Sequence, residues 1–246
     1  MSFKIETYTP IQALKPIADN IWLVDGPVIH FKSVPFPTRM TVIRLGSGEL
    51  FIHSPVAPDE TLLSEIDKLG PVRHLVSPNK IHYWWIGAWG ERYPDAIKWA
   101  SPGVRPSAQQ QGWDFDRDLA DTPEPAWSED IDQLVVTGGR FFDEVVFFHR
   151  ASRTLILADL IENFEGPKVR SPLLRLLLKL AGNLDPDGKL PIDLRLSYWG
   201  RHALLRRSIE RMLEWRPDRV VLAHGRWYEK NGTDELRRAF RWVRGL

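Results

Sequence analysis

Residues 72–87 read VRHLVSPNKIHYWWIG, and they contain a strand, a loop and the start of a helix. The run VRHLV has the β-branched residues typical of a β-strand, and the bulky apolar residues after the loop predict a short helix. The loop between them carries one histidine, His82. A loop that follows a strand in this way has the outline of a metal-binding loop. It is therefore a metal site, the remnant of one, or an ordinary turn.

The composition is that of a globular protein and excludes several kinds of site. Of the 246 residues, 43 % are hydrophobic and 26 % are charged, which is ordinary for a folded domain. The net charge of +1 creates no strong field that would attract nucleic acid or an anionic membrane. Cysteine is absent, which excludes disulfides, thiolate zinc sites and cysteine nucleophiles. Because the chain shows no signal-like or membrane-spanning apolar run, we expect a cytoplasmic protein.

Strands precede helices in both halves of the chain. We expect a hairpin over 39–55, a helix over 59–70, a long surface connection over 101–127, a strand over 131–138, a hairpin over 144–160, helices over 171–182, 194–215 and 234–246, and a strand over 218–225. Two such halves predict a layered α/β fold with the sheets inside and the helices outside. No linker composition interrupts the chain, so we expect a single domain over 1–246.

The helix over 171–182 is rich in leucine and has two interpretations. Arg175 and Lys179 lie four residues apart on one face, and leucines cover the remainder. Such a helix can lie on a membrane surface, or it can pack against the core with a narrow solvated stripe. We favour packing against the core, so membrane contact through this helix is the minor alternative.

Four of the seven histidines lie at or just after the ends of predicted strands: His53, His82, His149 and His224. Side chains in α/β proteins converge for chemistry beyond the carboxyl ends of strands. These histidines are therefore the first candidates for a functional site.

The hairpin over 144–160 reduces this set. A turn at residues 150–153 pairs Thr154 with His149 and brings Glu144 opposite Asp159, with β-carbons about 5 Å apart. His149 would then lie at the turn end, roughly 16 Å from that pair. If Asp159 is a ligand, His149 is excluded as one.

The order of these signals resembles the metallo-β-lactamase superfamily. The resemblance is carried by LKPIADNIWLVDG (14–26), FIHSP (51–55), SPNKIHYWWIG (77–87), LILADLIENF (155–164) and VVLAHG (220–225). It implies a four-layer αβ/βα sandwich of two similar halves, with the active site along one edge of the sheets. The longer phrases around 39–55 and 144–164 are similar to an uncharacterised branch of that superfamily, a domain of unknown function.

The resemblance also implies that the metal motif is degenerate. The superfamily motif is Thr-His-x-His-x-Asp-His-x-Gly. In this chain Ser77 takes the threonine position, Pro78 and Lys80 take the first two histidines, His82 takes the aspartate and Tyr83 takes the last histidine. Both histidines that would hold one zinc from this loop are therefore replaced.

Further positions of the superfamily pattern are partly kept. The phrase with a later histidine is replaced by TGGRFFDE at 137–144. The strand-end aspartate matches Asp159, and the closing Gly-His matches Ala223-His224. The acidic residue after the early strand is replaced by His53.

The retained residues are sufficient for one ion. His82, Asp159 and His224 supply two imidazoles and a carboxylate, which can hold one zinc, iron or manganese ion. A single bound ion and a metal-free site are equally supported. A site with two metal ions is disfavoured, because the Lys80 ammonium would repel the dications. The complete set of site candidates is His82, Asp159, His224 and His53 as metal ligands, with Glu144, Lys80 and Tyr83 as catalytic residues.

Two functions follow from this set. The first is a mononuclear metal-dependent hydrolase of an ester, lactone or phosphodiester, with Glu144 accepting a proton or orienting a histidine. The second is a non-catalytic protein that has lost the metals and binds a small molecule in the sheet-edge cleft beside Lys80, Tyr83, Trp84 and Trp85. No basic run exceeds two residues, so we expect no nucleic-acid partner. The sequence predicts neither the substrate nor the oligomeric state.

Overall fold

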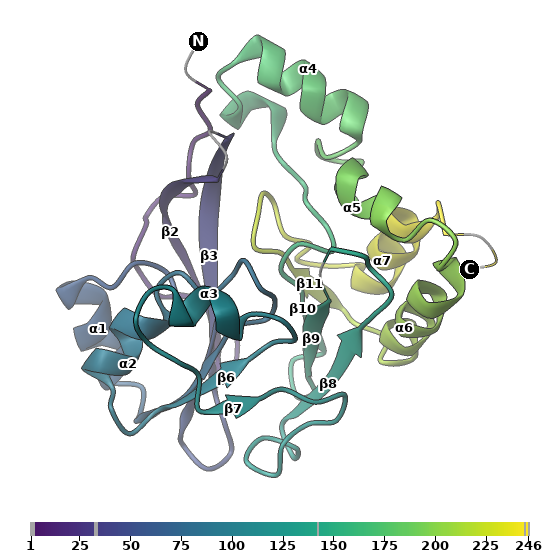
Figure 1. Cartoon of the computed structure of the whole chain (residues 1–246). Helices are drawn as coiled ribbons and strands as arrows, with labels where there is room; N and C mark the ends of the chain where they lie inside the picture. Colours follow the sequence, from purple (N-terminus) through teal and green to yellow (C-terminus); the bar gives the residue numbers. More distant parts are fainter. Residues whose placement is uncertain (1–2, 32–33, 142, 244, 246) are drawn as a thin grey trace.

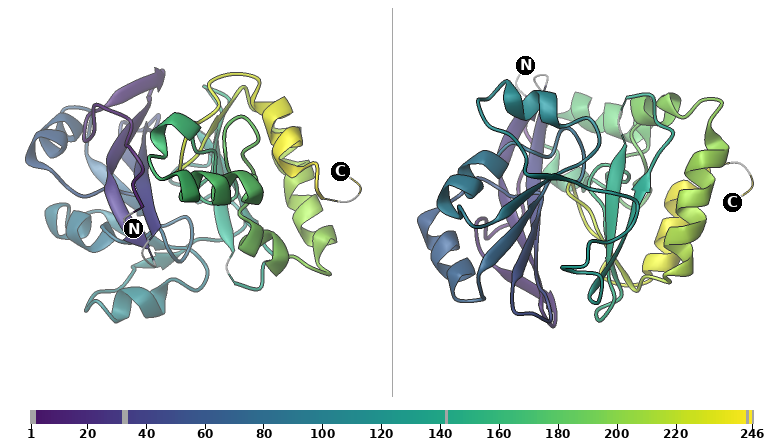
Figure 2. Two further views of the ribbon diagram at one scale, coloured as in Figure 1. Left: turned by 90° about the horizontal axis from the view of Figure 1, so that it is seen from above. Right: turned by 60° about the horizontal axis from the view of Figure 1, so that its bottom comes forward.

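The protein is a sandwich of two β-sheets with helices on both outer sides. The computed structural model describes residues 3–31, 34–141, 143–243 and 245. The right-hand view of Figure 2 shows the two sheets face to face, with one group of helices outside each. The predicted four-layer αβ/βα sandwich is therefore confirmed.

The first sheet is formed by the N-terminal half. Its strands, in spatial order, are β1 (Lys15–Ala18), β2 (Ile21–Phe31), β3 (Val34–Arg44), β4 (Leu50–His53), β5 (Val72–Val76), β6 (Ile97–Ala100) and β7 (Arg117–Asp118). Strands β1 to β4 pair antiparallel, as the predicted hairpin over 39–55 requires. Strands β4 to β7 pair parallel, so the carboxyl ends of β4 and β5 lie at the same edge.

Three helices cover the outer face of this sheet: α1 (Glu60–Asp67), α2 (Ile86–Arg92) and α3 (Arg105–Gln109). The side chain of Asp59 caps α1 as predicted, because it accepts hydrogen bonds from the backbone N–H groups of Thr61 and Leu62. The expected surface connection over 101–127 is wrong, since it contains α3 and β7. Its apolar side chains join the core, which a pattern without periodicity does not reveal.

The second sheet contains β11 (Arg219–Val221), β10 (Thr154–Ile156), β9 (Glu144–His149) and β8 (Ile131–Val136) in that order. The predicted register of the hairpin is confirmed, with Thr154 opposite His149. Strands β10 and β11 pair parallel, so both end at one edge.

The outer face of the second sheet is covered by α6 (His202–Glu214) and α7 (Gly232–Phe240). The helix expected over 194–215 is divided into α5 (Ile192–Ser197) and α6, because the chain turns at Gly200, whose φ is +76°. The helix expected over 234–246 ends at Phe240, and residues 244 and 246 lie outside the described part of the chain.

Aromatic side chains fill the space between the sheets. Phe51 of β4 packs edge-on against Phe147 of β9 and against Trp127, with ring centroids 5.2 Å apart in both pairs. All three side chains are buried. Burying a phenylalanine contributes roughly 2–3 kcal/mol, so this cluster holds the sheets together and fixes the spacing of the edge where their strands end.

The helix α4 (Pro172–Ala181) has the predicted bounds but not the predicted burial. The Ser171 hydroxyl accepts from the backbone N–H of Leu174, and Gly182 ends the helix with a left-handed φ of +75°. Of the ten residues of α4, all described, Leu174 alone is buried. The prediction of a core-packed helix is wrong because α4 lies over the upper edge of the sandwich, not on a sheet face (Figure 1). Within the described residues, no helix has the length and apolarity to cross a bilayer.

Candidate functional site

Three of the predicted ligands meet where the strands of both sheets end. His82 follows β5, Asp159 follows β10 and His224 follows β11. The Nε2 atom of His82 lies 3.1 Å from Oδ2 of Asp159, and Nε2 of His224 lies 3.2 Å from Oδ1. One donor atom from each of the three residues lies within 4.8 Å of the others. The structure therefore brings two imidazoles to one carboxylate.

The outer nitrogen of each imidazole is also held. Nδ1 of His82 lies 2.7 Å from the hydroxyl oxygen of Ser54, and Nδ1 of His224 lies 2.7 Å from the carbonyl oxygen of Pro37. A carbonyl oxygen only accepts, so Nδ1 of His224 must carry the proton. Its Nε2 then presents either a second proton or a lone pair to Asp159.

This arrangement requires positive charge between the residues. A lone pair on Nε2 of His224 would repel the carboxylate oxygen 3.2 Å away. The contact becomes favourable when Nε2 is protonated or when a cation lies between the two atoms. The group is thus either an imidazolium–carboxylate network or a cation site.

Two further side chains, Glu144 and Asn79, hold Asp159 in place by hydrogen bonds. Glu144 accepts from the backbone N–H groups of Ala158 and Asp159, both at 2.8 Å. The amide of Asn79 donates to Glu144 at 3.0 Å and to Asp159 at 2.8 Å. Glu144 and Asp159 therefore lie close together as expected, linked by the Asp159 N–H and by the Asn79 amide. Glu144 is fully buried, so its geometry is that of a positioning residue.

Electrostatics keeps Asp159 ionised. Burial opposes the charge, but the positive charge of His82 and the hydrogen bonds from both imidazoles hold the pKa of Asp159 below its usual range. For the neighbouring Glu144, burial followed by the charge on Asp159 raises the pKa. The two carboxyl groups therefore differ, with Asp159 as the anionic centre.

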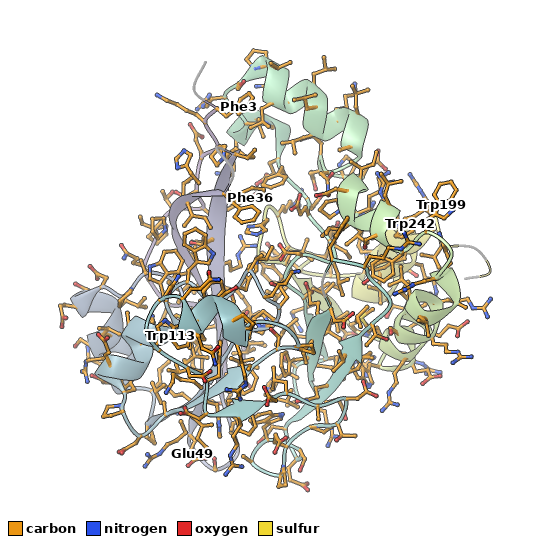
Figure 3. The ribbon with its side chains drawn as sticks, viewed as in Figure 1. Phe3, Phe36, Glu49, Trp113, Trp199 and Trp242 are labelled. Atoms are coloured by element: carbon orange, nitrogen blue, oxygen red, sulfur yellow. The ribbon has the colours of Figure 1, made fainter. Side chains whose placement is uncertain are left out.

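A pocket of about 650 Å³ lies over the three residues. Its polar lining includes Lys80 and Glu162 in addition to His82, Asp159 and His224, and much of the remainder is apolar. Phe36 of β3 packs on the His224 ring with centroids 5.1 Å apart, and Figure 3 shows its side chain above the centre of the sandwich. The group thus lies at the base of a pocket large enough for a small molecule.

The other predicted site residues lie at different places. Lys80 lines the pocket, whereas Tyr83 packs in the apolar cluster beneath α2, with its ring 6.4 Å from that of Trp113. His53 is buried against Phe147 and is not part of the described metal-ligand group. Burial and then the charge of His82 lower the pKa of His53 to about 3. The catalytic roles of Lys80, Tyr83 and Glu144 stay predictions.

Arg39 anchors the loop that carries His224 and was not among the predicted site residues. Its guanidinium donates to the carbonyl oxygens of Leu222 at 2.7 Å and Gly225 at 2.8 Å. The same group pairs with Asp25 at 2.7 Å, and its side chain is 3 % exposed. Nothing in the local pattern around Arg39 reveals these contacts, because its carbonyl partners follow more than 180 residues later.

Glu162 was also missed, although it lies only three residues after Asp159. Its carboxyl lines the pocket, and burial raises its pKa to about 8. In its protonated form Glu162 can donate a hydrogen bond into the pocket.

The raised pKa of Glu162 predicts a pH-dependent stability. The folded protein holds a proton that the unfolded chain releases above about pH 4.5, so wild-type stability falls as pH rises toward 8. In Glu162→Gln this loss is absent, and the variant should gain on the order of 3 kcal/mol relative to wild type between pH 5 and 9. Urea unfolding in EDTA measures the difference. Glu229→Gln, at an exposed glutamate, is the control, and an equal pH slope for wild type and Glu162→Gln would contradict the assignment.

Solved structures with a similar fold are metallo-β-lactamases. One from Pontibacter korlensis is 16 % identical and covers 95 % of this chain and 99 % of its own, with a TM-score of 0.63. FIM-1 from Pseudomonas aeruginosa, solved in its mono-zinc form, is 14 % identical over 94 % of both chains, with a TM-score of 0.62. A metallo-β-lactamase from Hirschia baltica is 14 % identical over 95 % of this chain and 98 % of its own, with a TM-score of 0.60.

At these identities the likeness concerns the fold alone. No curated protein sequence matches the chain. The family described as Domain of unknown function (DUF4336) matches residues 18–176, which include His82 and Asp159 and end before His224. The chain therefore belongs to the DUF4336 family, and its fold is that of the metallo-β-lactamases.

Proposed function

We propose that this protein is a hydrolase that uses one metal ion held by His82, Asp159 and His224. Its substrate would be an ester, lactone or phosphodiester with an apolar portion. The observation that carries the proposal is the convergence of these three side chains at the base of the pocket, with the outer nitrogen of both imidazoles hydrogen-bonded.

The residues fit a single ion by their chemistry and spacing. Two imidazole nitrogens and a carboxylate are a common catalytic ligand set for zinc, iron or manganese. The nitrogen–oxygen separations of 3.1 and 3.2 Å are close to the distance of about 3.4 Å between ligands that share a tetrahedral zinc ion. The contacts of Nδ1 with Ser54 and with the Pro37 carbonyl are those that usually orient histidine ligands.

A second ion is disfavoured by Lys80. This residue lines the pocket at the motif position of a superfamily histidine. An ammonium in the same pocket repels a further dication. The mono-zinc form of FIM-1 is a solved example of this fold with one zinc.

The bound ion would act as a Lewis acid toward a carbonyl or phosphoryl oxygen and would lower the pKa of a water molecule. Glu144 and Asn79 hold Asp159 in place for that ion. Lys80 can bind an anionic oxygen of the substrate, and Glu162 can donate its carboxyl proton to the departing alcohol oxygen. Water is added across the ester bond, and an acid and an alcohol leave.

Metal analysis of protein purified without chelator tests the proposal. We expect about one equivalent of zinc, iron or manganese, and a rise in Tm when the ion is returned to EDTA-treated protein. His224→Ala should retain less than about a tenth of an equivalent. His30→Ala, at an exposed histidine of β2, should bind as wild type does. Wild-type protein with less than about a tenth of an equivalent would overturn the metal assignment.

A non-catalytic binding protein is the second candidate. It is favoured by the contacts of Asp159, because Nε2 of both imidazoles and the amide of Asn79 lie within hydrogen-bond distance of its carboxylate. The pocket would then bind a small molecule with an anionic group near Lys80 and an apolar part against Trp84 and Trp85. Thermal stabilisation by such a ligand that persists in EDTA, without turnover, distinguishes this function from the first.

A further inference from the structure

Helix α4 presents an apolar stripe to solvent. Leu173, Leu176, Leu177 and Leu180 are 48 %, 53 %, 49 % and 73 % exposed. Their spacing of three and four residues places them on one side of the helix. A surface helix normally buries such a stripe against its own protein. An exposed stripe is typical of a helix that binds another protein or a membrane.

The exposed apolar surface continues beyond α4. In α5 and the turn after it, Ile192, Leu196 and Trp199 are 52 %, 57 % and 72 % exposed. Figure 1 shows α5 directly after α4 along the upper part of the molecule, and Figure 3 shows Trp199 pointing away from the protein. The apolar platform is defined here as Leu173, Leu176, Leu177, Leu180, Ile192, Leu196 and Trp199.

The charge around the apolar platform identifies its partner. Residues 168–201 contain seven lysines and arginines but three acidic residues, although the whole chain has a net charge of only +1. The exposed cations include Lys179 and Arg201, whereas Arg170 is paired with Glu6 at 2.6 Å. Leucine and tryptophan flanked by lysine and arginine are typical of helices that lie in an anionic lipid interface. A second copy of this chain would instead bring like charges together.

The apolar platform is continuous with the pocket. Leu178 and Ala181, on the inner side of α4, line the pocket, as does Ile192 of the platform. Trp84 and Phe141 also line the pocket and are 40 % and 56 % exposed. In the view from above in Figure 2, α4 and α5 lie over the edge of the sandwich. A surface that contacts the platform would therefore meet the pocket.

We propose that α4 and α5 dock this protein on the surface of an anionic lipid bilayer. The leucines and Trp199 insert among the acyl chains, and the surrounding lysines and arginines contact the lipid phosphates. The pocket then receives the apolar part of its ligand from the lipid phase. Docking does not depend on a metal in the site.

Flotation with defined vesicles tests the docking. Wild-type protein should float with vesicles of phosphatidylglycerol and phosphatidylcholine, and far less with phosphatidylcholine alone or in high salt. The double variant Leu176→Gln/Leu180→Gln should bind roughly a hundredfold more weakly. Lys179→Glu should bind roughly tenfold more weakly. Ile11→Gln removes a similarly exposed aliphatic side chain outside the platform and should bind as wild type does.

The changed side chains are exposed, so all variants should keep the wild-type Tm and circular dichroism. Equal flotation of the leucine variant and wild type would overturn the proposal. It would also be overturned if wild type failed to bind phosphatidylglycerol vesicles. A wild-type dimer that the leucine variant converts to a monomer would instead assign the platform to a second copy.

Discussion

Asp159→Asn is expected to abolish metal binding and to destabilise the metal-free protein by roughly 3 kcal/mol. The carboxylate accepts from Asn79 and His82 on one oxygen and from His224 on the other. An asparagine offers one oxygen and one amide group, so at least one of these buried donors loses its acceptor. The neutral side chain also removes the negative charge that would balance a cation.

Calorimetric titration with zinc measures the loss of metal binding. Urea unfolding in EDTA separately measures the loss of stability of the metal-free protein. Asp193→Asn is the matched control, because Asp193 lines the same pocket but is exposed and lies outside the metal-ligand group. It should bind zinc and unfold as wild type does. If Asp159→Asn bound zinc as tightly as wild type, the ion would be held elsewhere.

Arg39→Ala should cost about 3–5 kcal/mol of the free energy of unfolding, because it breaks a buried ion pair. Among the described residues, the change leaves the Lys15 ammonium at 2.8 Å as the remaining cation paired with the buried Asp25. It also leaves the carbonyl oxygens of Leu222 and Gly225 without the guanidinium. These oxygens flank His224, so metal affinity should fall together with stability.

Urea unfolding and metal titration of Arg39→Ala check both results. Arg44→Ala is the control, since Arg44 lies on the same strand β3 and is exposed. It should change stability by less than about 0.5 kcal/mol. Equal losses in the two variants would show that the buried contacts of Arg39 contribute nothing specific.

Much of the fold could be predicted because its signals are local. The hairpin over 144–160 has a short turn at residues 150–153, so its register followed from counting back along both strands. Asp59 and Ser171 cap the N-termini of their helices and Gly182 ends α4, in each case through contacts within a few residues. The connection over 101–127 was mispredicted because its buried residues have no regular period, and tertiary packing alone shows that they are core.

The site was predictable in part for the same reason. His82, Asp159 and His224 each lie just after a strand, and strand ends are visible in the sequence. Asn79, Ser54 and Arg39 act through partners distant along the chain: the amide of Asn79 contacts Asp159 80 residues away, and Arg39 contacts Leu222 183 residues away. No pattern of neighbouring residues encodes such contacts.

The sequence by itself therefore determined the layered α/β fold, the register of the hairpin over 144–160 and the ends of the helices at 59–70 and 171–182. With the family resemblance it also indicated His82, Asp159 and His224. The tertiary structure alone decided how those side chains are oriented and that burial raises the pKa of Glu162. It also decided that the leucines of α4 face solvent, although their pattern equally suits a core helix. The physical reason is that periodicity specifies which residues share a face, whereas only packing specifies what that face meets.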